Sequence, residues 1–434
     1  MLWIAIRDAL LLAALAPFGF CLFAIVAARK FFRSDADSEV ATNHSFTQKA
    51  REGTEESLLT RHSSLATGLP GPLFTRHSPL VTALPPVSIL RPIYGLDREA
   101  YENFASFCRQ QYPEFEMLFC VSDENDPAIP VIHKLIADFP QKKICLLVGS
   151  EPLGVSDKIN KLCRMAKEAH HDVLIVCDSD VRVEPGFLRA IAAPFAEAPV
   201  ADTEVGGVTC LYRGLTDGSL AADLEAIGNS TDFAAGVLLA RALSGVDFML
   251  GAVMATTKAR LAKIGGFEAL VNHFSDDYEL GNRIARAGHR IELSRFPVSI
   301  VYPRENFLGA FRQQTRWYAS VKHSRPWGHI GLIFSQPLPW TILAAIIAPE
   351  LWMSLAYVGA CLLLRGWSAW AVGVSGMHDD LVRRKFWLLP LRDLFAFASW
   401  IASFFPRRIN WRGQQFYVRN RQLVRVPTRN VNSR

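Results

Sequence analysis

From Val87 onward the chain alternates between short apolar runs and amphipathic stretches, and this alternation limits its fold more than any other feature. The apolar runs are rich in β-branched residues, as in "VSIL", "FEMLFCVS", "KICLLVG", "DVLIVC" and "VGGVTCLY". Amphipathic stretches such as "DPAIPVIHKLIADF" lie between them. Alternation at this spacing predicts an α/β fold, in which helices cover both faces of a mostly parallel sheet. In such sheets, ligands bind at the carboxyl ends of the strands.

The N-terminal segment has the length of a membrane span. Residues 9–28 carry no charge, and Arg29, Lys30 and Arg33 follow them. A run of about 20 apolar residues is long enough for a helix to cross a bilayer. Residues 1–33 could be a membrane anchor or a signal peptide. We favour the anchor, because the basic cluster follows the apolar run instead of preceding it. The same cluster predicts that the next part of the chain is cytoplasmic.

The region after the α/β pattern is apolar again. Only Glu350 and Arg365 interrupt residues 331–374, so we expect about two spans within 326–375. An aromatic stretch at 386–405 carries Arg392 and Asp393 in its middle, which favours a helix lying in the membrane interface. The chain then ends in a tail with eight Arg and no acidic residue from 406 onward, which suits anionic lipid or nucleic acid.

Between the anchor and the α/β region lies a segment with linker composition. Residues 34–85 are rich in Ser, Thr, Gly and Pro, and contain an imperfect duplication, "LTRHSSLATGLP" and "FTRHSPLVTALP". Such composition predicts a low-complexity linker. The predicted organisation is therefore an anchor, this linker, a catalytic domain at 86–325, the membrane region at 326–375, and an interfacial helix with a basic tail at 376–434. The eight Cys show no CxxC spacing and fit reduced thiols in a cytoplasm-like compartment.

Two carboxylates one residue apart end the apolar run "DVLIVCDSD". Asp178 and Asp180 either form a polar turn or hold a divalent metal at the carboxyl end of a strand. Two hard oxygen ligands suit Mg²⁺ or Mn²⁺, which completes its shell with water and substrate phosphate. Asp-x-Asp alone carries little information, since "DAD" also occurs at 35–37. The strand context favours the pair at 178 and 180.

Two further acidic positions follow the same logic. Asp123 ends an earlier strand and either accepts hydrogen bonds from a nucleotide or forms an Asx turn. Asp276 and Asp277 begin a helix in "HFSDDYELGNRIARAGHRI", where they either cap the helix or direct a carboxylate base into the crevice.

Two helical positions complete the set. Gln313, Arg316 and Trp317 occupy one face of a predicted helix, which an amphipathic helix at the membrane surface would also explain. Lys158 in "GVSDKINKL" begins a helix where an anion could sit, although a solvated Lys is the simpler interpretation.

Taken in this order, the motifs resemble those of inverting glycosyltransferases of the GT-A fold, and most closely the ceramide glucosyltransferase family, including bacterial relatives that act on hopanoids. The similarity runs from "PPVSILRPIYGLD" through "CDSDVRV", "SDDYELGNRIARAGHRI" and "QQTRW" to "INWRGQQFYVR". The resemblance implies a GT-A nucleotide-diphospho-sugar transferase fold with N-terminal and C-terminal transmembrane helices. It also implies a divalent metal, Mg²⁺ or Mn²⁺, a UDP-sugar donor and a lipid acceptor.

The resemblance assigns roles residue by residue. Asp277 becomes the general base, and Asp178 and Asp180 become the metal and diphosphate site. Asp123 contacts the nucleotide and Lys158 the donor phosphates. Gln313, Arg316 and Trp317 hold the diphosphate and acceptor region. The stretch 224–240 keeps "LE" but lacks a His that animal members carry, which leaves the identity of donor and acceptor open.

The implied function is transfer of a sugar, glucose from UDP-glucose in the simplest case, to a lipid hydroxyl such as that of ceramide, with inversion. The expected location is a multi-pass membrane protein with a cytoplasmic catalytic domain, in the bacterial inner membrane. A hopanoid N-acetylglucosaminyltransferase would share every motif. A processive polysaccharide synthase would need more spans. A membrane-anchored nucleic-acid binder would rest on the Arg-rich tail alone, and we expect no nucleic-acid partner.

Overall fold

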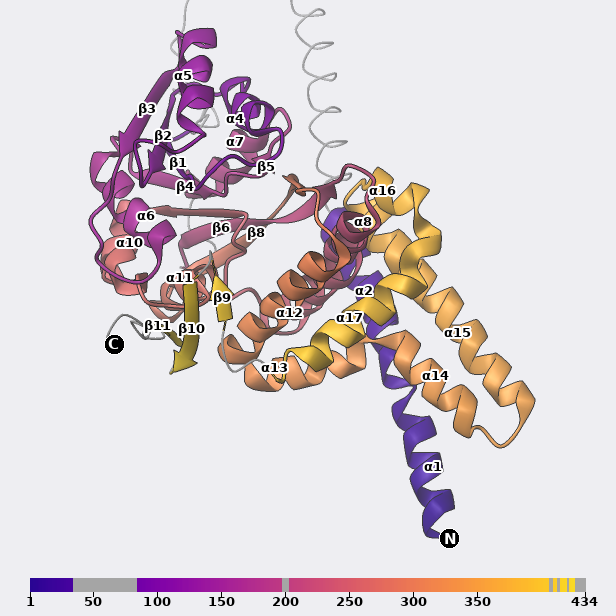
Figure 1. The fold of residues 1–434 in the computed structure, drawn as a ribbon. Coiled ribbons are helices and arrows are strands. Elements are labelled where there is room, and N and C mark those ends of the chain that lie inside the picture. Colours follow the sequence, from indigo (N-terminus) through magenta and orange to yellow (C-terminus); the bar gives the residue numbers. More distant parts are fainter. Residues whose placement is uncertain (34–83, 197–202, 406–408, 412–413, 420, 426–434) are drawn as a thin grey trace, which may run out of the picture.

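A computed structural model describes residues 1–33, 84–196, 203–405, 409–411, 414–419 and 421–425. The linker, its duplicated segments and "DAD" at 35–37 therefore lie outside the described residues, apart from the last residues of the second copy. An α/β body stands beside a group of apolar helices, and the N-terminal helix projects away from both (Figure 1).

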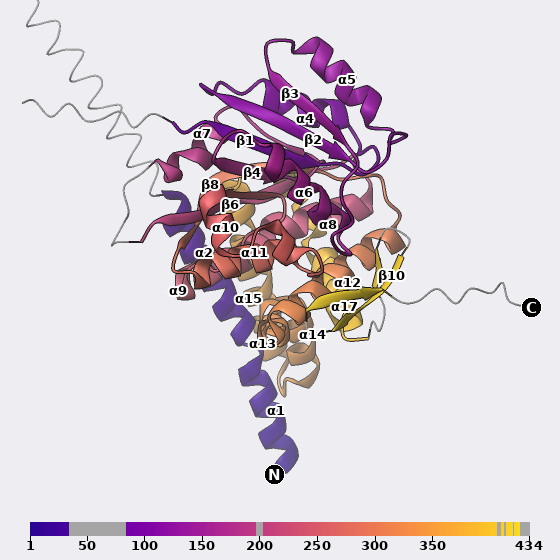
Figure 2. The same cartoon turned by 90° about the vertical axis from the view of Figure 1, so that its left-hand side faces the viewer.

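The α/β body is built on an eight-stranded sheet with the order β3-β2-β1-β4-β7-β6-β8-β5 (Figures 1 and 2). The strands β1, β2, β3 and β4 are parallel to one another, as the alternating pattern predicts. Strand β7 runs antiparallel to β4 and β6, and β8 runs parallel to β6. The strand bounds are β1 (Val87–Pro92), β2 (Phe115–Val121), β3 (Lys143–Val148), β4 (Val173–Cys177), β5 (Val181–Arg182), β6 (Val205–Leu215), β7 (Val253–Thr257) and β8 (Arg290–Val301).

Helices cover both faces of the parallel half of the sheet, because successive side chains of a buried strand point to opposite faces. On one face, Ile89 packs with Phe104 and Phe107. On the other face, Leu90 packs with Leu162 and with residues of α11. The helices of this body are α4 (Ala100–Cys108), α5 (Ile129–Asp138), α6 (Asp157–Glu168), α7 (Phe187–Ala192), α10 (Lys258–Lys263) and α11 (Asp276–Arg286).

The remaining helices form a second layer beneath the sheet. A long helical segment, α8–η2–α9, contains one π-helical turn in its middle, a feature that is frequent at functional sites. Helix α12 packs against α8, α13 and α17. The bounds are α8 (Leu220–Gly228), η2 (Asn229–Phe233), α9 (Ala234–Ser244), α12 (Phe307–Ser324), α13 (Pro326–Gly331), α14 (Pro337–Ile347), α15 (Leu351–Ala369), η5 (Trp370–Gly376), α16 (Asp380–Arg384) and α17 (Leu389–Ala402).

Candidate membrane helices lie near both ends of the described chain, as the sequence predicts. The segment Leu2–Arg33, which comprises α1 (Leu2–Ala13) and α2 (Ala16–Arg33), and the segment Leu351–Gly376 are each long and apolar enough to cross a bilayer. The helices Pro326–Ser335 and Pro337–Ile347 meet that test only together and are bent by 58°. Within the described residues this gives two candidate spans, or three if the bent pair is one span. The predicted number of three agrees with the upper value.

Helix α17 buries two charged side chains inside the protein. Arg392 and Asp393 are both buried. Asp393 pairs with Arg365 of α15 at 2.9 Å, and Arg392 pairs with Asp232 of η2 at 3.2 Å. Arg365 also reaches Asp232 at 2.5 Å. The sequence argument for an interfacial helix rests on unpaired charges, whereas here each charge has a partner inside the protein. The position of α17 relative to the membrane stays a prediction.

The basic tail differs from the expectation, because part of it is a folded element. Strands β9 (Ile409–Trp411), β10 (Gln414–Arg419) and β11 (Gln422–Arg425) form an antiparallel sheet, which we call the C-terminal sheet. Phe416 and Leu423 are buried against Phe274. The apolar side chains within "QFYVR" and "QLVR" supply the buried face, so this stretch packs on the α/β body. Residues 426–434 lie outside the described part.

Candidate active site

Four polar segments meet at one edge of the sheet. The carboxyl ends of β1, β2 and β4 lie at this edge because the three strands are parallel. Strand β7 begins at the same edge because it is antiparallel to β4, with Cys177 opposite Val253. The loop that carries Asp178 therefore lies next to the turn that carries Gly251, and the loop that carries Asp123 lies at the same edge on the far side of β1.

Backbone hydrogen bonds hold the loop from Asp178 to Asp180 between two other strands. The amide of Asp178 donates to the carbonyl oxygen of Ala252 at 3.3 Å. The carbonyl oxygen of Asp180 accepts from the amide of Val301 at 2.9 Å. These contacts to β7 and β8 fix the loop at the point where β4 ends.

A buried arginine supports the same loop from below. The guanidinium of Arg91 donates from Nη2 to the carbonyl oxygen of Ser179 at 3.0 Å. It is fully buried and lies over the rings of Phe107 and Phe104, at 4.4 and 5.1 Å from their centroids. The sequence analysis missed Arg91, because one Arg within a strand pattern resembles an exposed charge. Its position between apolar residues that face the core is the signal that could have found it.

Lys158 connects two of the predicted acidic motifs. Ser156 caps α6 by accepting from the amide of Ile159, and this cap places Lys158 in the first turn. Its Nζ lies 2.7 Å from Asp178 Oδ1 and 3.6 Å from Asp276 Oδ2. Although burial opposes it, the charges of Asp178 and Asp276 raise the pKa of Lys158. The lysine is therefore a fixed positive charge in the site, and not a solvated side chain.

Gly251 marks a space that two carboxylates share. A Cβ atom built on Gly251 would lie 3.3 Å from Asp277 Oδ2 and 3.9 Å from Asp178 Oδ2. Asp277, the predicted base, and Asp178, a predicted metal ligand, thus both face the space next to Gly251. The other oxygen of Asp277, Oδ1, accepts from the amide of Tyr278 at 2.7 Å, which orients the carboxylate.

We expect Gly251→Ala to lower the turnover rate by about tenfold or more, because displacement of a reacting group by less than 1 Å is costly in catalysis. The added methyl group would push on Asp277 Oδ2 at 3.3 Å. Gly236→Ala is the matched control, since a Cβ there meets nothing within 4 Å. The measurement is the turnover rate and unfolding temperature of both variants. Equal rates for Gly251→Ala and Gly236→Ala would contradict the proposed position of the base.

Crowding of carboxylates changes their acidity. Burial, with the charges of Asp178 and Asp97, raises the pKa of Asp180 to about 7. Burial, with the charge of Asp276, raises the pKa of Asp277 to about 6. Carboxyl groups with pKa values near neutrality are frequent where a site binds cations or moves protons. The raised values follow first from burial and then from neighbouring carboxylates at this edge of the sheet.

Tyr212 of β6 borders the same carboxylates and was also missed. Its ring stacks on Phe233 with centroids 5.2 Å apart. Burial raises the pKa of Tyr212, and the charges of Asp277 and Asp178 raise it further. Its place near the end of the apolar run "GGVTCLYRG" is a signal that could have drawn attention to it.

Asp123 does not join this cluster. Its carboxylate is exposed and accepts hydrogen bonds from the backbone amide and from Nδ2 of Asn125, at 2.7 and 3.0 Å. This is the Asx turn that the sequence left open. The turn lies at the same edge of the sheet, because the neighbouring Ser122 donates to Asp157 of α6 at 2.6 Å.

The predicted Gln-x-x-Arg-Trp motif borders the site from α12. The hydroxyl groups of Ser320 and Ser324 lie 2.5 and 3.0 Å from that of Ser275, which precedes Asp276. Gln313 is seven residues from Ser320, about 10 Å along the helix axis. Trp317 packs against a cluster that contains Tyr302. Burial raises the pKa of Glu225 to about 8, and the charge of Arg316 offsets a small part of this rise. The motif therefore extends along α12 from the loop before Asp276 toward α8.

The donor set fits a divalent cation that is held largely by substrate. Among the described residues, no group of three or more His, Cys, Asp or Glu side chains is arranged to hold a metal ion. Asp178 and Asp180 supply two carboxylates, and burial with the charge of Asp178 raises the pKa of Asp180, so that a bound cation would stabilise its ionised form. Mg²⁺ and Mn²⁺ accept one or two protein carboxylates when phosphate oxygens and water complete the shell.

Comparison with known proteins identifies the family. The family profile described as "Glycosyl transferase family 21" matches residues 59–424 of the chain. The chain belongs to glycosyl transferase family 21. This membership, with the mixed sheet and the apolar helices at both ends, confirms the fold class predicted from the sequence.

Curated relatives of this family 21 chain confirm the resemblance. It is 27% identical over 239 residues to "Ceramide glucosyltransferase 1" of Caenorhabditis elegans. That match covers 53% of this chain and 48% of the relative. It is 37% identical over 116 residues to a ceramide glucosyltransferase of Candida albicans, covering 24% of this chain and 21% of the relative. The chain thus spans at most about half the length of these relatives.

Solved structures of glycosyltransferases are also similar to this family 21 chain. One is a mannosyltransferase of Pyrobaculum calidifontis in complex with GDP-Man and Mn²⁺, with 15% identity and a TM-score of 0.48. That match covers 92% of this chain and 99% of the other. Another is TarS of S. aureus, residues 1–349, with 13% identity and a TM-score of 0.38, covering 77% of this chain and 96% of that one.

Proposed function

We propose that this chain transfers a sugar from a nucleotide-diphosphate donor, UDP-glucose in the simplest case, to the hydroxyl group of a membrane lipid such as ceramide, with inversion. The observation that carries the proposal is the shared space at Gly251, where Asp277 and Asp178 face each other and Lys158 adds a positive charge. The names of the curated relatives support ceramide as the acceptor.

Asp277 acts as the general base in this mechanism. The lipid hydroxyl oxygen attacks the anomeric carbon of the sugar while the bond from that carbon to the diphosphate oxygen breaks. The hydroxyl proton passes to the carboxylate of Asp277, and UDP leaves with the bonding electron pair. One displacement of this kind inverts the anomeric centre. The orientation of Asp277 by the Tyr278 amide supports this role, since a base must be held within hydrogen-bond reach of its proton.

The opposite side of the shared space binds the donor. Lys158 is placed to contact the diphosphate, and Arg91 keeps the loop of Asp178 and Asp180 in position. Asp178 and Asp180 would hold Mg²⁺ or Mn²⁺, which when bound neutralises charge on the leaving diphosphate. Asp123 contacts the nucleotide from the neighbouring loop. Gln313, Arg316 and Trp317 border the acceptor side.

The decisive experiment offers labelled UDP-glucose, UDP-N-acetylglucosamine and UDP-galactose to membranes that contain the full chain, with ceramide or a hopanoid added. A labelled lipid after extraction supports the proposal and names the donor and the acceptor. Label in a hopanoid from UDP-N-acetylglucosamine would select that alternative. Label only in a polymer would contradict lipid glycosylation and support a processive synthase.

We further propose a cytoplasmic catalytic domain in a bacterial inner membrane, with three spans. The basic residues Arg29, Lys30 and Arg33 at the end of the first candidate span support this orientation. A reporter fused after Arg434 should then be cytoplasmic, because an even number of further spans returns the chain to that side. An external signal from the reporter would contradict the count of three.

A further inference from the structure

One short segment, residues 271–275, lies between the loop before α6 and the C-terminal sheet. It follows the 3-10 helix η3 (Phe267–Leu270) and ends directly before Asp276, the first residue of α11. On one side it contacts the loop that leads to Lys158. On the other side His273 forms a bridge with Gln422 of the C-terminal sheet. The 271–275 segment therefore determines how the lysine and the start of α11 lie relative to each other.

Two hydrogen bonds join the 271–275 segment to the loop before α6. The amide of Val155 donates to the side-chain oxygen Oδ1 of Asn272 at 3.0 Å. The amide of Ser156 donates to the carbonyl oxygen of Val271 at 2.8 Å. Because Ser156 caps α6, these bonds fix the first turn of that helix, in which Lys158 lies. Of the two bonds, the one to Asn272 uses a side chain, so a substitution can remove it without changing the backbone.

The loop and the segment approach each other closely at Gly154. A Cβ atom built there would lie 2.5 Å from the Cβ of Val271 and 2.8 Å from Oδ1 of Asn272, so a side chain would not fit. Gly154 is also bound to α6. Its amide donates to Oδ1 of Asn160 at 3.1 Å, and its carbonyl oxygen accepts from Nδ2 of the same residue at 3.0 Å. The loop is thus held between the 271–275 segment and its own helix.

Apolar packing surrounds the same contact. Val155 lies against the buried cluster of Phe274, Phe416 and Leu423. Closely packed side chains transmit a displacement to their neighbours, because they leave few voids that could absorb it. Loss of the hydrogen bond to the Val155 amide should therefore shift the loop as a unit, and Lys158 with it.

We propose that Asn272 is a positioning residue for sugar transfer, whose side chain holds α6 against the start of α11 so that Lys158 contacts the donor diphosphate. Lys158 Nζ lies 2.7 Å from Asp178 and 3.6 Å from Asp276, so a shift of α6 changes its distance to both carboxylates. Asn272 acts through the lysine and does not itself touch the substrates. This inference rests on the proposed function, because it uses the role of Lys158 toward the donor.

The test is a double-mutant cycle that measures the dissociation constant of UDP for the full chain in detergent, with Mn²⁺ present. Lys158→Ala should weaken UDP binding by roughly tenfold or more, because hydrogen bonds to a charged group are lost. Asn272→Ala should weaken it by about fivefold when Lys158 is present, but by less than about twofold when Lys158 is already Ala. Asn272→Asp keeps the acceptor oxygen and should restore the affinity to within about twofold of wild type.

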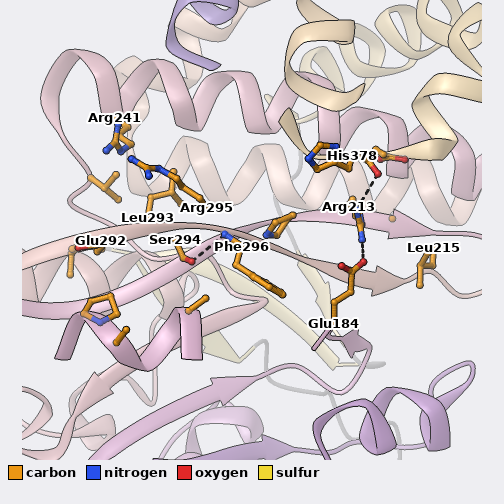
Figure 3. Close-up of a pocket in the computed structure, with 18 of the residues that line it drawn as sticks. Glu184, Arg213, Leu215, Arg241, Glu292, Leu293, Ser294, Arg295, Phe296 and His378 are labelled. Carbon is orange, nitrogen blue, oxygen red and sulfur yellow. Dashed lines mark hydrogen bonds and ion pairs between the residues drawn. The ribbon is translucent and has the colours of Figure 1, made fainter. Parts of the chain in front are cut away.

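A second variant and a control accompany this cycle. Gly154→Ala should displace the same loop and weaken UDP binding by about fivefold, again when Lys158 is present. Ser294→Ala is the matched control, because the Ser294 hydroxyl likewise accepts from a backbone amide, that of Phe296, at 3.2 Å (Figure 3). Ser294 lines a cavity of about 1490 Å³, and none of the residues that line this cavity belongs to the candidate active site. The control should bind UDP as wild type does.

Two results would overturn the role of Asn272 and leave the proposed function intact. One is unchanged UDP affinity in Asn272→Ala when Lys158→Ala has lost it. The other is an equal loss for Asn272→Ala with and without the lysine, which would mean that Asn272 acts through another group. Unchanged affinity in Lys158→Ala would instead remove the lysine from the donor site, and with it both this role and that part of the proposed function.

Discussion

Asp277→Asn should lower the turnover rate by about a thousandfold while the donor still binds. General-base assistance is worth about 10²–10⁴ in rate, and an amide cannot accept the proton. The substitution preserves the size of the side chain, so the space at Gly251 keeps its shape. The measurement pairs the turnover rate at saturating donor with the dissociation constant of UDP-glucose. An equal loss in both quantities would assign Asp277 to donor binding.

A control and a pH profile sharpen this prediction. Glu279→Gln removes a carboxylate from the same helix, but Glu279 faces Arg283 and Arg421, so the rate should change only a few-fold. The wild-type rate should fall about tenfold for each pH unit below about 6, because burial and Asp276 raise the pKa of Asp277 to about 6 and protonation inactivates the base. The Asp277→Asn variant should lack this acidic limb.

Asp180→Ala should weaken metal-dependent donor binding by roughly a hundredfold without lowering the unfolding temperature. The loss follows from removal of one of the two carboxylates that we propose hold the cation. The stability of the fold should not fall, because burial and the charge of Asp178 raise the pKa of Asp180 to about 7. A raised pKa means that folding disfavours the ionised carboxylate, first because Asp180 is buried, so its removal should not lower stability.

The matched control for this variant is Asp172→Ala, an exposed carboxylate before the opposite end of β4. It should bind the donor as wild type does. Donor binding and turnover of the wild-type chain should disappear in EDTA and return with Mn²⁺ or Mg²⁺. Full activity in EDTA, or a normal donor affinity of Asp180→Ala, would remove the metal from the mechanism.

Much of the site is predictable because its residues follow strand ends. A run such as "DVLIVC" predicts a buried parallel strand, and parallel strands bring the residues after them to one edge. This reasoning places Asp178 at the same edge of the sheet as Asp123. Family resemblance, and not periodicity, chose the base over the helix-cap interpretation for Asp277, because the position of α11 depends on packing against β6 and β8.

The missed features depend on contacts between residues far apart in the sequence. Arg91 resembles a surface charge until Phe104 and Phe107 enclose it. Arg392 and Asp393 resemble unpaired charges until Asp232 and Arg365 supply partners from distant parts of the sequence. A local pattern contains no information about such partners. Burial of a charge can therefore be inferred only when the whole fold is known.

The C-terminal sheet has a consequence for how the enzyme is made. The amide of Leu423 donates to the carbonyl oxygen of Asn272 at 2.8 Å, and the amide of Phe274 donates to that of Arg421 at 3.1 Å. These bonds hold the segment just before Asp276 and Asp277. During translation, residues 272–277 leave the ribosome long before residues 421–423 are synthesised. The segment before Asp276 therefore gains this supporting strand only after the helices between them, from α12 to α17, have been synthesised. Premature termination between the end of α17 and Arg421 would leave a protein that has its apolar helices but lacks this support before Asp276.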